Sequence, residues 1–153
     1  MSEPATTQST GQDVPAADPK PDPYGGAGPG QNFQYVVIRV VPRVEREEFI
    51  NAGVVLFCRI CSYLEARVEL NTRLLTALAP EADTESIQAQ LNAYVRIAAG
   101  DVTAGPVARL SQSERYHWLS APSSTVVQTS PGHTGICSDP GATLAHLFAK
   151  LVS

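Results

Sequence analysis

The segment Tyr35–Cys58, YVVIRVVPRVEREEFINAGVVLFC, constrains the fold of this chain more than any other part of its sequence. Its first part, Tyr35–Val41, is almost continuously apolar and β-branched, a pattern that is typical of a strand buried on both faces. Pro42 ends that strand, because proline cannot donate a hydrogen bond to a sheet ladder. A charged loop follows, and Phe49–Cys58 reads as a second strand. The segment therefore predicts two strands joined by a charged loop.

The next part of the chain adds a third strand and a short helix. Apolar and polar residues alternate cleanly over Tyr63–Leu70, which predicts an antiparallel strand with one exposed face. The short connection Arg59–Ser62 predicts a hairpin between this strand and the one before it. Asn71 is a good N-cap for a short helix, which Pro80 stops.

Two longer helices are predicted by their capping residues and apolar stripes. Asp83 or Thr84 caps one of them, and Gly100 is placed to close it in a left-handed conformation. The C-terminal helix begins with Asp139 as N-cap and Pro140 at the first helical position. Leucine and phenylalanine residues then recur at helical spacing, as expected for a helix with one buried face.

Two further short strands are predicted at Arg115–Ala121 and Ser124–Thr129, with a break at Pro122. The order of elements is therefore βββααββα. Grouped rather than alternating strands and helices are typical of an α+β domain. We expect a mostly antiparallel sheet of about five strands with helices packed on it.

Residues 1–32 differ in composition from the rest of the chain. They hold six of the twelve prolines and five glycines, and Tyr24 is the only aromatic residue before Phe33. Such a segment cannot bury enough apolar surface to offset the entropy lost on ordering, so a disordered tail is predicted. It is either a plain extension or a tether that holds a partner. Residues 33–153 are predicted to form a single α+β domain.

Charge, hydropathy and cysteine content exclude several classes of protein. The net charge is −4, and residues 1–32 contribute four carboxylates against one lysine, or −3. The predicted domain is therefore nearly neutral, which disfavours a nucleic-acid binder with a broad basic face. No apolar run approaches the roughly 20 residues that a membrane span needs. An odd count of three cysteines suits reduced thiols, so we expect a soluble, cytoplasmic protein.

Arg39 is a polar exception within the first strand. Strand alternation places it on the same face as Tyr35 and Val37, where a guanidinium is costly unless it has a partner. In one interpretation Glu45, Glu47 or Glu48 from the following loop supplies that partner and the ion pair braces the hairpin. In the other, Arg39 and Arg43 face a cleft and hold an anion.

Asn51 and Gly53 are exceptions within the second strand. They are two residues apart and are expected to share a strand face. A glycine inside a strand often marks a bulge or a close approach of another backbone. A bulge whose backbone satisfies Asn51 is favoured over a ligand contact.

A second polar segment, Arg109–Thr134, holds most of the remaining candidate side chains. Four of them are candidates for ligand contact: Arg109, Arg115, His117 and His133. Histidine titrates near neutral pH, so His117 is either a proton carrier or a ring bonded to a backbone carbonyl. The sequence holds no Gly-x-Ser-x-Gly elbow, phosphate-binding glycine loop or paired-carboxylate signature. Whether the chain is an enzyme therefore stays open, and its catalytic residues are unknown.

A zinc site is the remaining chemical possibility. Cys58-x-x-Cys61 together with His133-x-x-x-Cys137 would give three sulfurs and one nitrogen, a set that zinc accepts. However, Cys58 continues the apolar register of its strand, so burial as a small hydrophobic residue explains it. We expect neither a metal ion nor a cofactor.

Two motif blocks give the chain a resemblance to a family. They are R-x-V-P-x-x-x-R-x-E-F-x-N-x-G-V at Arg39–Val54 and S-E-R-[YF]-H-W at Ser113–Trp118, and the similarity covers essentially Phe33 to the C-terminus. The chain resembles an uncharacterised bacterial family, the domain of unknown function 3037 family. The family's polar positions fall on Arg39, Arg46, Glu48, Asn51, Gly53, Arg109, Arg115, His117 and His133. The resemblance implies no reaction, but it suggests genomic neighbourhood with a HipA-like kinase in actinobacteria.

Two hypotheses from different classes follow. The first is a small interaction or regulatory module that acts with a partner such as a HipA-like kinase. The second is an enzyme or a nucleotide- or anion-binding domain, which requires its polar side chains to converge on one concave surface: Arg39, Arg43, Glu48, Asn51, Arg115 and His117. A defence component that acts on nucleic acid is a third possibility, which the missing basic face disfavours.

Overall fold

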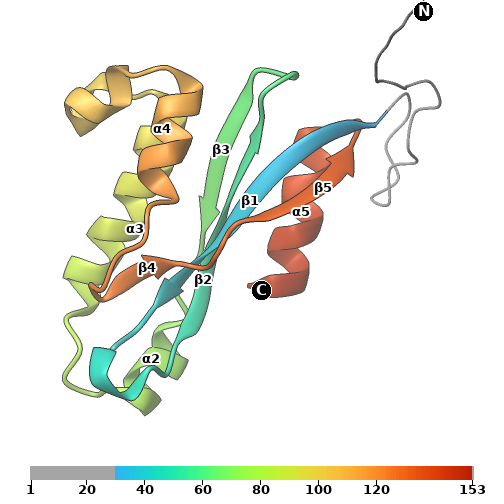
Figure 1. The fold of residues 1–153 in the computed structure, drawn as a ribbon. Helices are drawn as coiled ribbons and strands as arrows, with labels where there is room; N and C mark the ends of the chain where they lie inside the picture. The colour runs from blue at the N-terminus through green and yellow to red at the C-terminus, as the bar shows by residue number, and fades with distance from the viewer. Residues whose placement is uncertain (1–29, 153) are drawn as a thin grey trace, which may run out of the picture.

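Strand β1 lies at the centre of a five-stranded antiparallel sheet in the computed structural model, which describes residues 30–152 (Figure 1). β2 pairs with one edge of β1, and β3 pairs with β2. The other edge of β1 pairs first with β5 and then with β4. The strands are β1 (Gln31–Val40), β2 (Ile50–Cys58), β3 (Tyr63–Val68), β4 (Val127–Thr129) and β5 (His133–Cys137).

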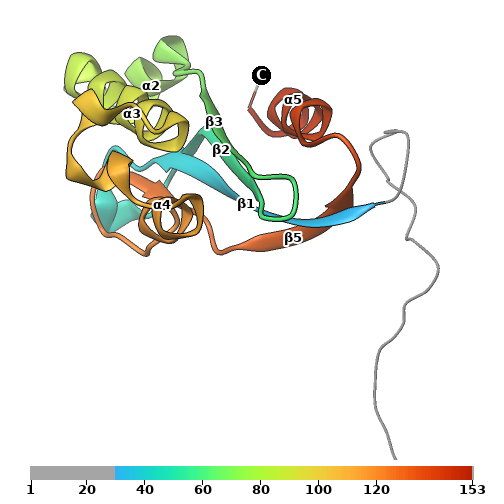
Figure 2. The same cartoon turned by 90° about the horizontal axis from the view of Figure 1, so that it is seen from above.

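Helices cover both faces of the sheet (Figures 1 and 2). Three of them pack against one face and α5 packs against the other. The helices are α2 (Thr72–Leu78), α3 (Thr84–Ala99), α4 (Gln112–Leu119) and α5 (Pro140–Leu151), with short 3-10 turns η2 (Val44–Arg46), η3 (Val102–Ala104) and η4 (Pro106–Arg109). The α+β class with an antiparallel sheet is confirmed.

The predicted helix caps form the contacts expected of them. The side chain of Asn71 accepts a hydrogen bond from the backbone N–H of Leu74 at the start of α2. Asp83 accepts from Ser86 at the start of α3, and Gly100 ends that helix with φ +76°. Each cap satisfies a backbone group that the helix itself leaves without a partner.

The prediction of a strand at Arg115–Ala121 is wrong, because residues 115–119 of this segment belong to helix α4. Its N-terminus is a capping box, in which Ser111 and Glu114 each bond the other's backbone N–H through their side chains. Tyr116 and Leu119, three residues apart, are both buried against the sheet, as positions on one face of a helix are. Helical spacing, not strand alternation, is the pattern that this segment obeys.

The strands after α4 differ in length and position from those that the sequence predicts. The strand predicted at Ser124–Thr129 is reduced to β4, Val127–Thr129. β5, His133–Cys137, was not predicted, because His133, Thr134 and Gly135 lack the β-branched apolar character of a typical strand. Its pairing with the first half of β1 is a long-range contact that no local pattern indicates.

The core consists of two clusters that share the central strands. On the face covered by α2, α3 and α4, alternate β1 residues such as Val36 and Ile38 pack with Leu91 and Leu119. On the opposite face, α5 buries another set: Phe33, Val54, Leu56, Cys58, Cys137, Leu144 and Leu147. Strand β2 is buried from Ala52 to Cys58, as a strand with helices on both faces requires.

A β-bulge interrupts the pairing of β1 with β2. Ile38 pairs with Gly53, whereas Arg39 pairs with Asn51, so Ala52 is an extra residue on β2. The expected bulge is present, but its backbone does not satisfy Asn51, whose side chain instead donates to the carbonyl of Leu151. The expectation that Asn51 and Gly53 share a face is wrong, because the inserted residue puts them on opposite faces.

The expected tail, residues 1–32, lies largely outside the described residues, and β1 begins at Gln31. Within residues 30–152, none of the helices has the length and apolar character needed to cross a membrane.

Candidate functional site

Arg39 lies in β1 on the face of the sheet that α5 partly covers. Its nearest cross-strand neighbours are Asn51 on β2 and Gln128 on β4, which pair with it directly. Directly paired residues point to the same side of a sheet, so the three polar side chains form a row. The bulge at Ala52 creates this row, because without the extra residue the register would place Asn51 on the other face.

The row borders a hollow of about 340 Å³ at the surface, which we call the Arg39 hollow. Its lining combines residues of β1, the loop before β2, and the segment around β4: Arg39, Val41, Val44, Glu47, Phe49, Ser123, Ser124 and Gln128. Phe49 and Val44 are large apolar residues that remain exposed here, by 48% and 37% of their surface. The hollow thus combines charged and polar side chains with exposed apolar ones.

The Arg39 guanidinium is held by an aromatic ring rather than by a carboxylate. Its central carbon lies 4.2 Å from the centroid of the Phe49 ring, a cation–π geometry. Its Nε is buried and has no hydrogen-bond partner among the described residues. The expected ion pair with Glu45, Glu47 or Glu48 does not form.

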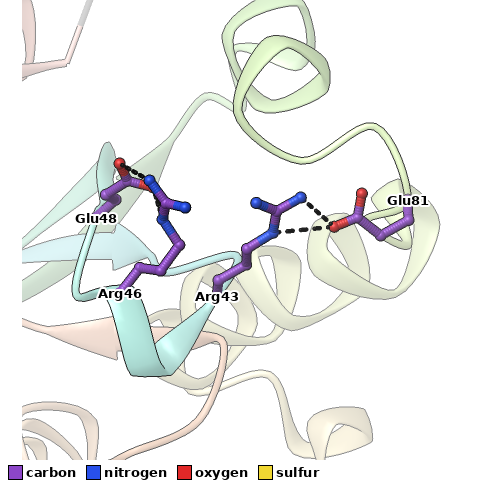
Figure 3. Close-up of polar contacts among 4 residues, drawn as sticks. All are labelled: Arg43, Arg46, Glu48 and Glu81. Carbon is purple, nitrogen blue, oxygen red and sulfur yellow. Dashed lines mark hydrogen bonds and ion pairs between the residues drawn. The ribbon is translucent and has the colours of Figure 1, made fainter.

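Glu81 and Glu48 form ion pairs with two other arginines, Arg43 and Arg46 (Figure 3). Arg43 donates from Nε and Nη2 to one oxygen of Glu81, at 3.2 and 2.9 Å. Arg46 holds both oxygens of Glu48, at 3.0 and 3.2 Å. The hydrogen bond between Arg43 and Glu81 raises the pKa of Arg43 and lowers the pKa of Glu81. Both pairs are exposed, so they contribute little to stability.

Asn51 connects the row to helix α5. Its side-chain Nδ2 donates to the backbone carbonyl of Leu151 at 3.1 Å, in the last turn of the helix. This satisfies one of the carbonyls that a helix C-terminus leaves free. The side-chain oxygen of Asn51 is buried without a hydrogen-bond partner among the described residues.

Arg115 has a structural position away from the hollow. It projects from α4, and its guanidinium donates to the carbonyls of Leu110 at 2.7 Å and Ala98 at 3.3 Å. It also lies against Gly100, where a Cβ would stand 3.6 Å from the guanidinium carbon. These bonds join α4 to the C-terminal end of α3 and to the segment after η4.

The remaining predicted residues do not line the Arg39 hollow. His117 is exposed on α4, across the sheet from Arg39, and its ring bonds no described residue. Arg109 is exposed at the end of η4. His133, on β5, stacks on Tyr35 with ring centroids 5.0 Å apart, about 13 Å along β1 from Arg39.

The structure therefore brings together only part of the predicted site. Arg39 and Asn51 are adjacent, and Arg43 and Glu48 lie in the loop next to them. Arg109, Arg115, His117 and His133 do not join them, so the six-residue convergence required by the second hypothesis is absent. The second polar segment meets the first through residues that were not among the predicted ligand contacts: Ser123, Ser124 and Gln128.

The arrangement is suited to binding rather than to a recognisable reaction. Arg39 offers a cation whose buried Nε–H has no described partner, and the hydroxyls and Gln128 offer further hydrogen bonds to an anion. Glu47 at the rim contributes a negative charge of its own. Within residues 30–152 there is no group of three or more His, Cys, Asp or Glu residues placed to hold a metal ion.

Comparison with known proteins gives one match. A family model described as "Protein of unknown function (DUF3037)" matches residues 35–152, which is most of the chain. No curated protein and no solved structure matches the chain.

Proposed function

Because this chain belongs to the DUF3037 family, whose description assigns no function, we propose one from the site: a small binding module that receives an anionic group of a protein partner in the Arg39 hollow. One observation carries the proposal. The buried Nε of Arg39 has no partner among the described residues, whereas Arg43 and Arg46 beside it each hold a carboxylate. A buried donor without a partner costs about 1–3 kcal/mol, which a bound anion would recover.

The surroundings of Arg39 support a protein partner. Arginine and aromatic residues are over-represented among the residues that dominate binding energy at interfaces. Here Phe49 orients the guanidinium and stays exposed together with Val44, and hydroxyl groups lie at the rim. An anionic side chain with an apolar neighbour is the group that fits such a surface.

We propose a HipA-like kinase as the partner, on the ground of the genomic neighbourhood that the family resemblance suggests. A carboxylate or a phosphorylated side chain of the kinase would occupy the Arg39 hollow. We place the complex in the cytoplasm, because three cysteines with no disulfide among them suit a reducing compartment.

The test is calorimetric titration of the full chain with the purified kinase. Arg39→Met keeps an unbranched apolar stem over Phe49 but removes the charge, and it is expected to weaken binding about 30-fold or more, since losing one partner of a buried charge pair costs about 2–5 kcal/mol. Arg73→Met, at an exposed arginine of α2, is the matched control and should bind like the wild type. Equal affinity of the Arg39→Met variant, or no binding of the kinase by the wild type, would refute the proposal.

The size of the hollow favours a second candidate, a domain that binds a small anion. About 340 Å³ lies within the usual range for small-molecule pockets. Titration with inorganic phosphate and with ATP, followed by ¹H–¹⁵N spectra, should shift the signals of the Arg39 Nε and the Gln128 amide. Shifts that persist in the Arg39→Met variant, or none at all, would exclude this candidate.

A further inference from the structure

The turn between β2 and β3 brings two cysteine sulfurs together. Cys58 is the last residue of β2 and pairs with Tyr63, the first residue of β3. The turn between them is closed by a hydrogen bond from the N–H of Ser62 to the carbonyl of Arg59, at 3.1 Å. It returns Cys61 over the end of the strand, so that its sulfur lies 2.7 Å from that of Cys58.

The two thiols differ in their access to solvent. Cys58 is fully buried in the cluster beneath α5, whereas Cys61 is partly exposed at the edge of the same cluster. The turn tip itself is open, with Ile60 exposed by 72% of its surface. A small reagent can therefore reach Cys61, and Cys58 is then the nearest sulfur behind it.

We propose that Cys58 and Cys61 form a reversible disulfide and that this dithiol reacts with low-molecular-mass organic disulfides. The Cys61 thiolate attacks one sulfur of the reagent and a first thiolate leaves, which gives a mixed disulfide on Cys61. Cys58 then attacks the Cys61 sulfur, and a second thiolate leaves. Two protein thiols are oxidised, one organic disulfide is reduced to two thiols, and the two protons pass to the leaving thiolates.

The surroundings of Cys61 indicate a slow reaction. Burial, together with the hydrogen bond to Cys58, raises the pKa of the Cys61 thiol to about 12. Little thiolate is present at neutral pH, so the first attack is slow. The reduced form, however, gains nothing from a stabilised thiolate, which would otherwise favour it over the disulfide.

This dithiol is separate from the Arg39 hollow. Cys58 and Asn51 stand at opposite ends of β2, about 23 Å apart along the strand. Oxidation would join the end of β2 to the following turn without touching the polar row. The inference therefore stands independently of the binding function proposed above.

The experiment uses the full chain in buffers with increasing ratios of oxidised to reduced glutathione, followed by alkylation and intact mass measurement. We expect the wild type to reach a form that takes up one alkyl group where the reduced protein takes up three, and whose own mass is lower by about 2 Da, the loss of two hydrogens. Trypsin cleaves after Arg59, between the two cysteines, so the disulfide should hold two tryptic peptides together until it is reduced.

Two variants locate the bond. Cys137→Ser removes the third cysteine and should still lose about 2 Da, as exchange between Cys58 and Cys61 requires. Cys61→Ser changes a partly exposed residue, and this variant should show no loss of mass, because Cys58 then lacks its partner. Cys58→Ser is less suitable, because a change in the core carries a risk of misfolding. Three alkylated thiols at every ratio, a lasting mixed disulfide on Cys61, or peptides joined through Cys137 would overturn the proposal.

Discussion

At Gly53 the backbone of β3 comes so close to β2 that no side chain fits between them. A Cβ at this position would stand 2.7 Å from the carbonyl oxygen of Arg67 and 2.9 Å from Cγ1 of Val68. The first of these atoms belongs to the backbone and cannot turn away. Glycine is therefore required here by space.

We predict that Gly53→Ala lowers the free energy of unfolding by about 1–3 kcal/mol, the range for overpacking a tight interior. Urea unfolding followed by circular dichroism measures it. Gly132→Ala is the control, because a Cβ there would have no described atom within 4 Å beyond its own chain neighbours, and its stability should change little. Equal effects at the two glycines would contradict the explanation by close approach.

Single residues also show how far sequence reasoning reaches. The face on which Arg39 points follows from strand alternation and is confirmed by its pairing with Asn51 and Gln128. Its expected carboxylate partner was wrong, because Glu48 bends back to Arg46 within the loop. The partners of an ion pair depend on the geometry of loops and on segments that are distant in the sequence. A local sequence pattern carries no information about either.

At the scale of elements, helix α5 is attached to the sheet at its C-terminal end by a side chain of β2. Asn51 donates to the carbonyl of Leu151, and the bulge at Ala52 points Asn51 toward the helix. The bulge thus acts on the helix as well as on the strand.

Asn51→Ala should lower the free energy of unfolding by about 1 kcal/mol, the net value of one such hydrogen bond. It should also speed hydrogen exchange in the last turn of α5 more than elsewhere, since that turn loses its attachment. Asn92→Ala on α3 is the matched control, because Asn92 is exposed and its side chain accepts a hydrogen bond from Gln88. Uniform exchange across α5 in the Asn51→Ala variant would argue against this role.

Elements with strong local signals were predicted and those without were missed. α2, α3 and α5 have side-chain caps and apolar stripes that the sequence displays. The capping box of α4 is also local, but its short exposed helix offers only Tyr116 and Leu119 to the core, and an alternating pattern masked it. β5 is a strand because β1 pairs with it, which is a tertiary cause.

At the scale of the whole molecule, the two core clusters lie on opposite faces of shared strands. β1 and β2 contribute residues to both clusters, so neither face can lose its packing while the other keeps an intact sheet. We therefore expect residues 33–153 to behave as a single domain.

We predict one cooperative unfolding transition, and Leu144→Ala tests it. Leu144 is fully buried on the face of α5 that packs against the sheet, so its truncation should cost about 2–5 kcal/mol. Trp118, on α4 across the sheet, reports the opposite face by fluorescence. Its transition and the circular dichroism transition should shift together, as two-state unfolding requires. A Trp118 transition left at the wild-type midpoint would instead indicate two independent units.

The order of most elements could be read from the sequence, and the site only in part. The polar segment Arg109–Thr134 does reach Arg39, through Gln128, but the motif block Ser113–Trp118 with Arg115 and His117 lies in α4 on the other face of the sheet. Because Arg115 and His117 lie on a helix at the other face of the sheet, their side chains cannot reach the Arg39 hollow in any conformation.

The divided outer edge of the sheet has a consequence for contacts between molecules. β4 and β5 are short, and Ser130 and Pro131 separate them. Ser130 fills the gap from within, since its side-chain oxygen accepts the N–H of Val37 at 2.9 Å. A second molecule that approaches this edge meets two short strands separated by a proline, which do not offer a continuous template for extending the sheet. The interruption thereby guards a strand-rich surface against aggregation.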